Sequence, residues 1–178
     1  MALKTIFLDR DGVINKEINY LYKKENFEFI DGVFDACLFF QNLNYQIIII
    51  SNQSGIARGF FSEKDYHILS KWLIKQFKEN GVSILDTYYC PHSPDASCNC
   101  RKPKPGMLIK AIDEYNIDVE MSWMIGDKET DIEAANLAGI NNTILVRSGH
   151  PIDETNSNAK FIIDSIKHSI GLIKETSL

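Results

Sequence analysis

The chain has 178 residues, with 24 Asp and Glu against 19 Lys and Arg, and a formal net charge of −5. Hydrophobic residues make up 44% of it, which is typical of a soluble globular domain with a sizeable core. The acidic balance argues against a general nucleic-acid binder, and we expect neither a signal peptide nor a membrane span, because no stretch has either pattern. We therefore expect one cytoplasmic, monomeric domain over residues 1–178, with neither nucleic acid nor a membrane as a partner.

Strand-like and helix-like segments alternate along the chain. In order, we expect a strand at 5–8, a helix at 31–43, a strand at 46–50, a helix from the N-cap Ser62 to about residue 80, a strand at 84–89, a helix at 106–115, a strand at 123–125, a helix at 130–138, a strand at 143–146, and an edge strand with a last helix within 159–178. This alternation predicts an α/β fold with a central parallel sheet covered by helices on both faces.

Polar side chains follow four of the predicted strands. They are Asp9 and Asp11 after the first, Ser51 to Ser54 after the second, Arg101 and Lys102 beyond the third, and Asp127 and Lys128 after the fourth. Because the carboxyl ends of parallel strands share one edge of a sheet, we expect these side chains to meet at one site. Each motif alone is explained by a turn, a helix cap or a surface lysine, but their coincidence at successive strand ends favours a functional site.

The residue types at this edge indicate phosphoryl chemistry. The carboxylates of Asp9, Asp11 and Asp127 repel one another unless a cation lies between them, and Mg²⁺ prefers such oxygen ligands. A cation beside a hydroxyl and ammonium groups suits a phosphoryl group. In this interpretation Asp9 attacks phosphorus, and Asp11 protonates the leaving oxygen and later activates water. Ser51 and Lys102 would hold the phosphoryl oxygens.

The motifs DRDGVIN, SNQSG, RKPKPGM and GDKETD resemble the four motifs of the haloacid-dehalogenase (HAD) superfamily of phosphohydrolases, and the resemblance spans nearly the whole chain. It implies a Rossmann-like three-layer sandwich, an aspartyl-phosphate on Asp9, and Mg²⁺ held by Asp9, the Asp11 carbonyl and Asp127. Asp131 would act behind these ligands rather than on the ion. Since one helix accounts for most of the stretch before Ser51, no large cap domain is expected.

A second candidate metal site lies in the loop CPHSPDASCNC, residues 90–100. Its candidate ligands are Cys90, His92, Cys98 and Cys100. Three thiolates and one imidazole make a closed tetrahedral Zn²⁺ shell, so this zinc would be structural and would fix Arg101 and Lys102 just downstream. A disulfide or free thiols are the alternatives, and a reducing cytoplasm disfavours the disulfide. Cys37 lies on an apolar helix face, and we expect it in the core.

A zinc loop directly before RKP is similar to the HAD subgroup that contains heptose bisphosphate phosphatases and histidinol-phosphate phosphatases. The stretches NFEFIDGV, NQSGIARG, KPGM and LVRSG resemble the heptose type. The short zinc loop is closer to the histidinol type, and Ser51 stands where the subgroup has threonine. The resemblance implies a small phosphorylated sugar as substrate, a heptose 1,7-bisphosphate that loses its C7 phosphate. Histidinol phosphate is the alternative substrate.

Carried over by position, the resemblance also implies which residues contact the substrate. They are Glu17, Ile18, Asn19, Tyr20, Ser51, Asn52, Gln53, Ser54, Arg101, Lys102 and Lys128. Arg101 suits a second phosphate, because a guanidinium group binds phosphate oxygens in a bidentate manner. For histidinol phosphate, Glu17 would have to face the amino group.

Two other functional classes stay open at this point. A signalling receiver domain also places Asp, Ser or Thr and Lys on a parallel sheet, but it would need neither the Asp9–Asp11 pair nor the zinc loop. A phosphatase acting on nucleic-acid ends would use the same chemistry, but the acidic balance and the lack of basic or aromatic stripes disfavour it.

Overall fold

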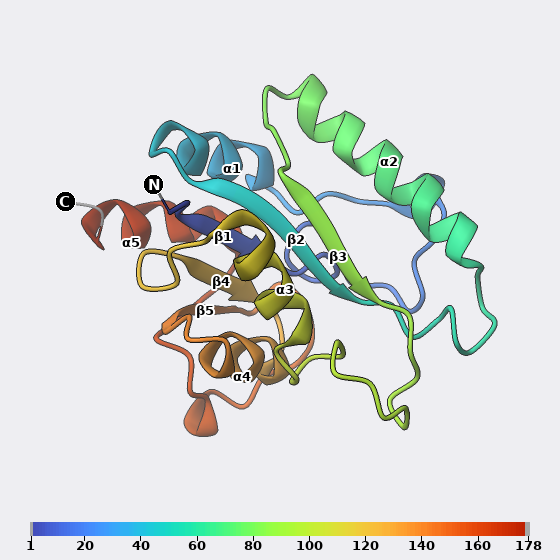
Figure 1. Cartoon of the computed structure of the whole chain (residues 1–178). Coiled ribbons are helices and arrows are strands. Elements are labelled where there is room, and N and C mark those ends of the chain that lie inside the picture. Colours follow the sequence, from blue (N-terminus) through green and yellow to red (C-terminus); the bar gives the residue numbers. More distant parts are fainter. Residues whose placement is uncertain (1, 177–178) are drawn as a thin grey trace.

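The computed structural model describes residues 2–176 and contains one parallel six-stranded sheet. The strands are β1 (Thr5–Leu8), β2 (Gln46–Asn52), β3 (Asp86–Cys90), β4 (Trp123–Gly126), β5 (Asn142–Val146) and β6 (Phe161–Ile163). They lie in the order β3-β2-β1-β4-β5-β6 (Figure 1). The chain therefore runs outward from β1 to one side and then returns to continue from β4 to the other side.

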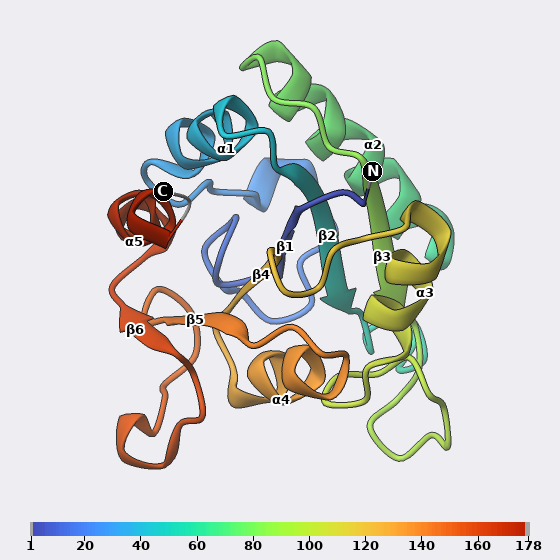
Figure 2. The same ribbon diagram turned by 60° about the vertical axis from the view of Figure 1, so that its left-hand side comes forward.

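Five helices cover the two faces of this sheet. They are α1 (Val33–Asn42), α2 (Glu63–Glu79), α3 (Gly106–Tyr115), α4 (Glu129–Leu137) and α5 (Ser169–Thr176), with short 3₁₀ turns at Lys24–Asn26, Glu154–Asn156 and Ile166–His168. Figures 1 and 2 show α1, α2 and α5 on one face and α3 and α4 on the other. The predicted α/β three-layer sandwich is confirmed, and between β1 and β2 the described chain holds only one 3₁₀ turn and α1 in place of a cap domain.

The alternation of side chains along the strands divides the core into two parts. Ile6 and Leu8 of β1 pack on the side of α1, α2 and α5, whereas Phe7 packs on the side of α3 and α4. Strands buried on both faces are apolar throughout, which is why QIIII in β2 could be predicted from its sequence. Cys37 is fully buried in the first part of the core, as expected.

Element boundaries differ from the prediction where local geometry intervenes. The helix expected from residue 31 begins at Val33, because Gly32 has a φ of +78°, a left-handed conformation that cannot continue into a helix. β2 runs on through Asn52, so Ser51 lies within the strand rather than after it. The strand expected at 84–89 is shifted to Asp86–Cys90. The last two residues of the predicted final helix, 177–178, lie outside the described residues.

The second helix follows its sequence signature closely. The Ser62 side chain accepts a hydrogen bond from the Asp65 backbone N–H at 3.1 Å, and the Asp65 carboxylate accepts one from the Ser62 N–H at 2.8 Å. The N-cap at Ser62 is confirmed, and Asp65 completes a reciprocal capping box with it. None of the helices within residues 2–176 is long and apolar enough to cross a bilayer.

Candidate active site and cysteine–histidine cluster

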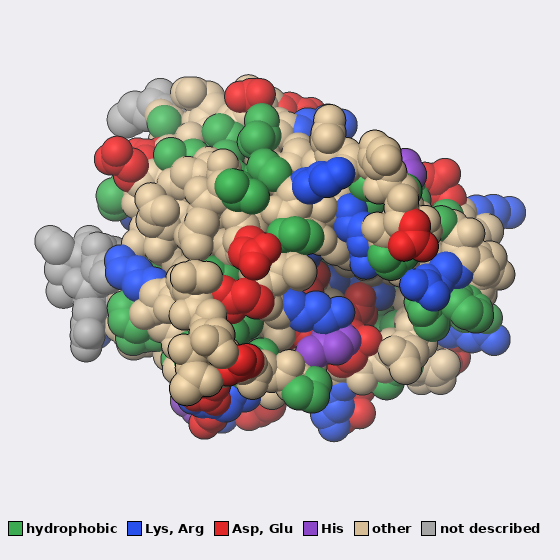
Figure 3. Space-filling model, turned by 90° about the horizontal axis from the view of Figure 1, so that it is seen from below, with side chains coloured by type: hydrophobic (Ala, Val, Ile, Leu, Met, Phe, Trp, Pro, Cys, Tyr) green, Lys and Arg blue, Asp and Glu red, His purple; other side chains and the backbone are tan. Residues whose placement is uncertain are grey.

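The carboxyl ends of β1, β2 and β4 open into a cavity of about 370 Å³. This is the point at which the strand order reverses, where open parallel sheets bind their ligands. Figure 3 looks at the molecule from below and shows basic and acidic side chains side by side around a hollow. The cavity is lined by residues of the predicted set, namely Asp9, Asp11, Glu17, Ile18, Asn19, Tyr20, Asn52, Gln53, Ser54, Arg101, Lys102, Asp127 and Lys128, and by Asp131, for which a supporting role was expected. It is also lined by residues that were not predicted, namely Arg10, Leu21, Gly55, Arg58, Pro94, Thr130 and His150.

Asp9 directly follows β1 and is only 8% exposed. Its Oδ1 lies 3.0 Å from the Lys102 ammonium and accepts a hydrogen bond of 2.9 Å from the Arg10 backbone N–H. Burial raises the pKa of Asp9 well above its usual value; Lys102 opposes this rise and the neighbouring carboxylates add to it. A further positive charge close to Asp9 would therefore favour its ionised form.

Lys102 is a buried basic residue of the site, with 4% exposure. Its ammonium group contacts Asp9 at 3.0 Å and Asp131 at 2.6 Å, and it donates to the Ile50 carbonyl at 3.0 Å. Burial alone would lower the pKa of Lys102, but the carboxylates of Asp131 and Asp9 raise it above its usual value. Lys102 thus stays charged at the strand ends, as a phosphoryl-binding group must.

Asp131, in the first turn of α4, has both of its carboxylate oxygens occupied. Oδ1 faces Lys102, and Oδ2 accepts hydrogen bonds from the backbone N–H groups of Asp127 at 3.1 Å and Lys128 at 3.0 Å. Asp131 therefore fixes the loop that carries Asp127 and the ammonium group of Lys102. This arrangement suits the supporting role expected for it.

Asp127 follows β4 and is fully buried. Its Oδ2 accepts hydrogen bonds from His150, whereas its Oδ1 is buried with no hydrogen-bond partner among the described residues. A buried, unpaired carboxylate oxygen is costly unless a cation or water binds it. Carboxylate oxygens of Asp9, Asp127 and Asp131 lie within 4.8 Å of one another, so this donor set fits a hard divalent cation such as Mg²⁺.

The Asp11 carboxylate is held by three side chains. Arg10 contacts both of its oxygens at 2.9 Å, Asn15 donates to Oδ1 at 3.0 Å, and Gln53 donates to Oδ2 at 3.2 Å. This leaves the backbone carbonyl, rather than the carboxylate, as the part of Asp11 that could bind a metal. Arg10 had been missed, although it stands between the two acids of the DRD motif, because its burial and its pairing appear only in the fold.

Ser51 is the predicted residue that lies just behind the cavity lining. It is 1% exposed, and its hydroxyl oxygen accepts a hydrogen bond of 2.6 Å from the Gln53 side chain. Asn52, from the same strand, exchanges hydrogen bonds of 3.1 Å with the backbone N–H and carbonyl of Lys102. β2 thereby places the chain segment of Lys102 beside β1.

The segment that follows the acidic motif closes one side of the cavity. Tyr20, with a φ of +58°, packs against Phe60 with tilted rings at a ring-centroid distance of 4.2 Å, and Tyr22 stacks on Phe61 at 5.5 Å. Within this segment, burial and the nearby Asp11 carboxylate raise the pKa of Glu17 to about 7. These two aromatic contacts join the segment of Tyr20 and Tyr22 to the loop after β2.

His150 comes from the loop after β5 and had not been predicted. Its ring Nδ1 lies 2.6 Å from Asp127 Oδ2, and its Nε2 lies 3.8 Å from Glu17. The same rule that identified the other residues would have found it, since it also follows a strand of the sheet.

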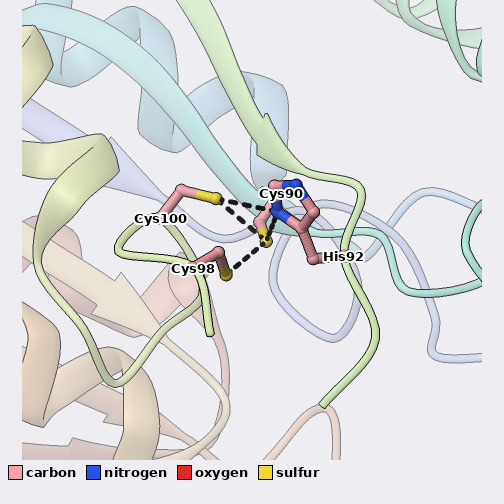
Figure 4. Close-up of side chains that lie close together, drawn as sticks. All are labelled: Cys90, His92, Cys98 and Cys100. Carbon is pink, nitrogen blue, oxygen red and sulfur yellow. Dashed lines mark hydrogen bonds between the residues drawn. The ribbon is translucent and has the colours of Figure 1, made fainter. Parts of the chain in front are cut away.

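The four residues Cys90, His92, Cys98 and Cys100 lie together at the end of β3 (Figure 4). Neighbouring ligand atoms are 3.2 to 3.8 Å apart, and no disulfide links the cysteines within the described residues. Two thiolates bound tetrahedrally at about 2.3 Å from one Zn²⁺ are about 3.8 Å apart, so the cluster fits a zinc ion. The loop leads directly into Arg101 and Lys102.

Comparison with known proteins gives a consistent result. A family model described as HAD-hydrolase-like matches residues 99–169. A D-glycero-alpha-D-manno-heptose-1,7-bisphosphate 7-phosphatase of Photorhabdus laumondii is 49% identical over 88% of this chain and 90% of that protein, and a D-glycero-beta-D-manno-heptose-1,7-bisphosphate 7-phosphatase of Vibrio cholerae is 45% identical over 94% of each. The crystal structure of the D,D-heptose 1,7-bisphosphate phosphatase from B. bronchiseptica, complexed with magnesium and phosphate, matches with a TM-score of 0.85 at 26% identity, covering 98% of this chain and 99% of that one. Together with the strand-end acids and Lys102, these matches establish that the chain belongs to the D-glycero-D-manno-heptose-1,7-bisphosphate 7-phosphatase family of HAD-type phosphatases.

Proposed function

We propose that this protein hydrolyses the C7 phosphate ester of a heptose 1,7-bisphosphate through an aspartyl-phosphate on Asp9. The observation that carries the proposal is the arrangement of Asp9, Lys102 and Asp127 at the point where the strand order reverses. The curated relatives favour this substrate over histidinol phosphate. A cavity of about 370 Å³ falls in the size range of small-ligand sites.

The chemistry follows from the positions of two acids. A carboxylate oxygen of Asp9 forms a bond to phosphorus while the bond from phosphorus to the C7 oxygen breaks. Asp11, held in place by Arg10, donates the proton that the leaving C7 oxygen needs. Water then attacks the aspartyl-phosphate as Asp11 takes its proton, which releases inorganic phosphate and regenerates Asp9.

Lys102 and Ser51 would hold the phosphoryl group in line for this attack. Mg²⁺, bound by Asp9, Asp127 and the Asp11 carbonyl, would supply positive charge to the phosphoryl oxygens and lower the repulsion among the acids. Lys102 is already paired with Asp9, so its ammonium group lies close to where those oxygens must bind. Zn²⁺ at the cysteine–histidine cluster would have a structural role only, because four protein ligands leave no open position.

Arg101 is the proposed site for the second phosphate. Its Nη1 is buried and has no hydrogen-bond partner within residues 2–176, and the residue lines the cavity, so an anionic ligand would satisfy it. Histidinol phosphate has no second phosphate and needs an anionic partner for its amino group instead. Glu17 would have to be that partner, and burial and the nearby Asp11 carboxylate disfavour its ionised form.

We expect phosphate release from heptose 1,7-bisphosphate to exceed release from histidinol phosphate by about a hundredfold or more in kcat/KM, or about 2.7 kcal/mol. The assay is run with Mg²⁺ on both the α and β anomers, since relatives of both kinds match. In Arg101→Ala the advantage of the bisphosphate over heptose 7-phosphate should largely disappear. Equal or better turnover of histidinol phosphate by the wild type would reject the heptose assignment while leaving the phosphatase chemistry intact.

Removal of zinc is expected to raise KM more than it lowers kcat. The cysteine–histidine loop carries few buried apolar side chains, so metal bonds would supply most of its order and would position Arg101. Cys98→Ser, with zinc content measured by atomic absorption, isolates this effect from chelation of Mg²⁺. Cys37→Ser is the matched control, since that thiol is buried in the core away from the cluster. An unchanged KM in zinc-free Cys98→Ser enzyme would contradict the proposed role.

A further inference from the structure

The carboxylate of Asp127 lies in a narrow space between two loops that both contain glycine. A Cβ atom at Gly12 would lie 2.3 Å from Asp127 Oδ2, and one at Gly149 would lie 2.1 Å from the same oxygen. Both distances are far below van der Waals contact, so only glycine permits the approach. The loop after β5 is also tied to the loop after β1, because the Ser148 hydroxyl donates to the Gly12 carbonyl at 2.7 Å.

The two oxygens of this carboxylate have different surroundings. Oδ2 accepts two hydrogen bonds from one residue, His150, at 2.9 Å from its backbone N–H and at 2.6 Å from its ring Nδ1. Oδ1 is buried and has no hydrogen-bond partner among the described residues. A carboxylate held by two donors on one oxygen cannot rotate freely, so its other oxygen keeps one direction.

We propose that His150 is a positioning residue for the catalytic divalent cation: it holds Oδ2 of Asp127 and thereby presents Oδ1 as the metal ligand. The inference rests on the proposed Mg²⁺ site at Asp9 and Asp127. Both bonds are made to the same charged oxygen, and the ring bond is the shorter, so it is the stronger one. Partners of this kind, which orient a metal ligand without touching the metal, typically change metal affinity by about 10- to 100-fold when removed.

The test measures Mg²⁺ binding directly, by titration calorimetry with MgCl₂ on the zinc-loaded protein without substrate. His150→Ala keeps the backbone donor and loses the ring, and its Kd for Mg²⁺ is expected to rise about 10- to 100-fold. His150→Asn is expected to restore an affinity near that of the wild type, because the amide nitrogen of Asn can occupy the place of Nδ1. The imidazole is 32% exposed and takes no part in the cysteine–histidine cluster, so neither change should alter zinc content.

Two controls separate this inference from the proposed metal site. His168→Ala removes an exposed histidine far along the chain, in the turn before α5, and should bind Mg²⁺ as the wild type does. Asp127→Asn should lose most of the affinity. If Asp127→Asn loses affinity but His150→Ala does not, the positioning role is overturned and the metal site stands. If the wild type binds no Mg²⁺, or Asp127→Asn binds as the wild type does, the proposed metal site fails and the inference fails with it.

A second variant that lacks the Nδ1 donor but keeps a side chain of similar size controls for a folding defect in His150→Ala. His150→Gln moves the donor one bond further from the backbone and should weaken Mg²⁺ binding in the same way as His150→Ala. Should His150→Ala be unfolded, the comparison of Gln with Asn decides the question. Equal Mg²⁺ affinity in these two variants would overturn the proposal.

Discussion

Asp9→Asn is expected to abolish turnover and yet to leave the folded chain at least as stable as the wild type in Mg²⁺-free buffer. The rate should fall by about five orders of magnitude or more, the scale on which loss of a covalent nucleophile acts. The free energy of unfolding should not fall, because burial and the surrounding carboxylates raise the pKa of Asp9 well above its usual value. An ionised Asp9 therefore costs stability at neutral pH, and asparagine removes that cost.

The raised pKa of Asp9 determines how the stability difference between Asp9→Asn and the wild type changes with pH. A carboxyl group whose pKa is raised in the folded state binds its proton more tightly there than in the unfolded chain. The stability that it contributes is present at acid pH and is lost as the pH rises from the unfolded value through the folded value. The difference in unfolding free energy between Asp9→Asn and wild type should therefore grow from acid to neutral pH.

Urea unfolding at several pH values, together with phosphate release, checks both parts of the prediction. Mg²⁺ must be removed by dialysis rather than with a chelator, because a chelator would also remove Zn²⁺ from the cysteine–histidine cluster. With Mg²⁺ present the order of stability should reverse, since the cation would bind and stabilise the wild type more. Turnover of Asp9→Asn near the wild-type rate would rule out Asp9 as the nucleophile.

The parts of the site that could be predicted from the sequence are those tied to a single strand end or a single loop. Asp9 and Asp127 follow short apolar strands, so their place at the sheet edge follows from parallel pairing alone. The spacing of Cys90 and Cys98 in a polar loop likewise indicates one cluster without reference to the fold. In these cases local pattern and tertiary position agree.

The parts that could not be predicted depend on contacts between distant segments. A charged Arg10 within a polar motif gives no sign that it is buried and holds Asp11. The place of His150 beyond a predicted strand could have been searched in the same way, but its pairing with Asp127 appears only in the fold. The contact between the rings of Tyr20 and Phe60 joins two loops, and no pattern in either loop's sequence relates it to the other.

Lys102→Met is expected to abolish turnover and, in contrast to Asp9→Asn, to destabilise the fold. The ammonium group is the cation that contacts both Asp9 and Asp131, and all three residues are buried. Replacing a whole buried ionic group with apolar residues can be neutral, but removing one partner leaves the others uncompensated and typically costs about 3–5 kcal/mol. Lys102 lowers the pKa of Asp9, so its loss should raise that pKa further, and the variant should regain stability as the pH falls.

A double-mutant cycle distinguishes this electrostatic account from a simple packing defect. In Lys102→Met with Asp131→Asn, one of the two unpaired charges is gone, while the asparagine oxygen can still accept a hydrogen bond from the Lys128 N–H. Unfolding free energies in Mg²⁺-free urea at pH 7 should therefore show that the double variant recovers part of the stability lost in Lys102→Met. If the losses in unfolding free energy of the two single variants instead added up in the double variant, methionine would destabilise the site by its shape. In that case the pairing of Lys102 with Asp131 would not be what holds the end of β2 and the start of α4 together.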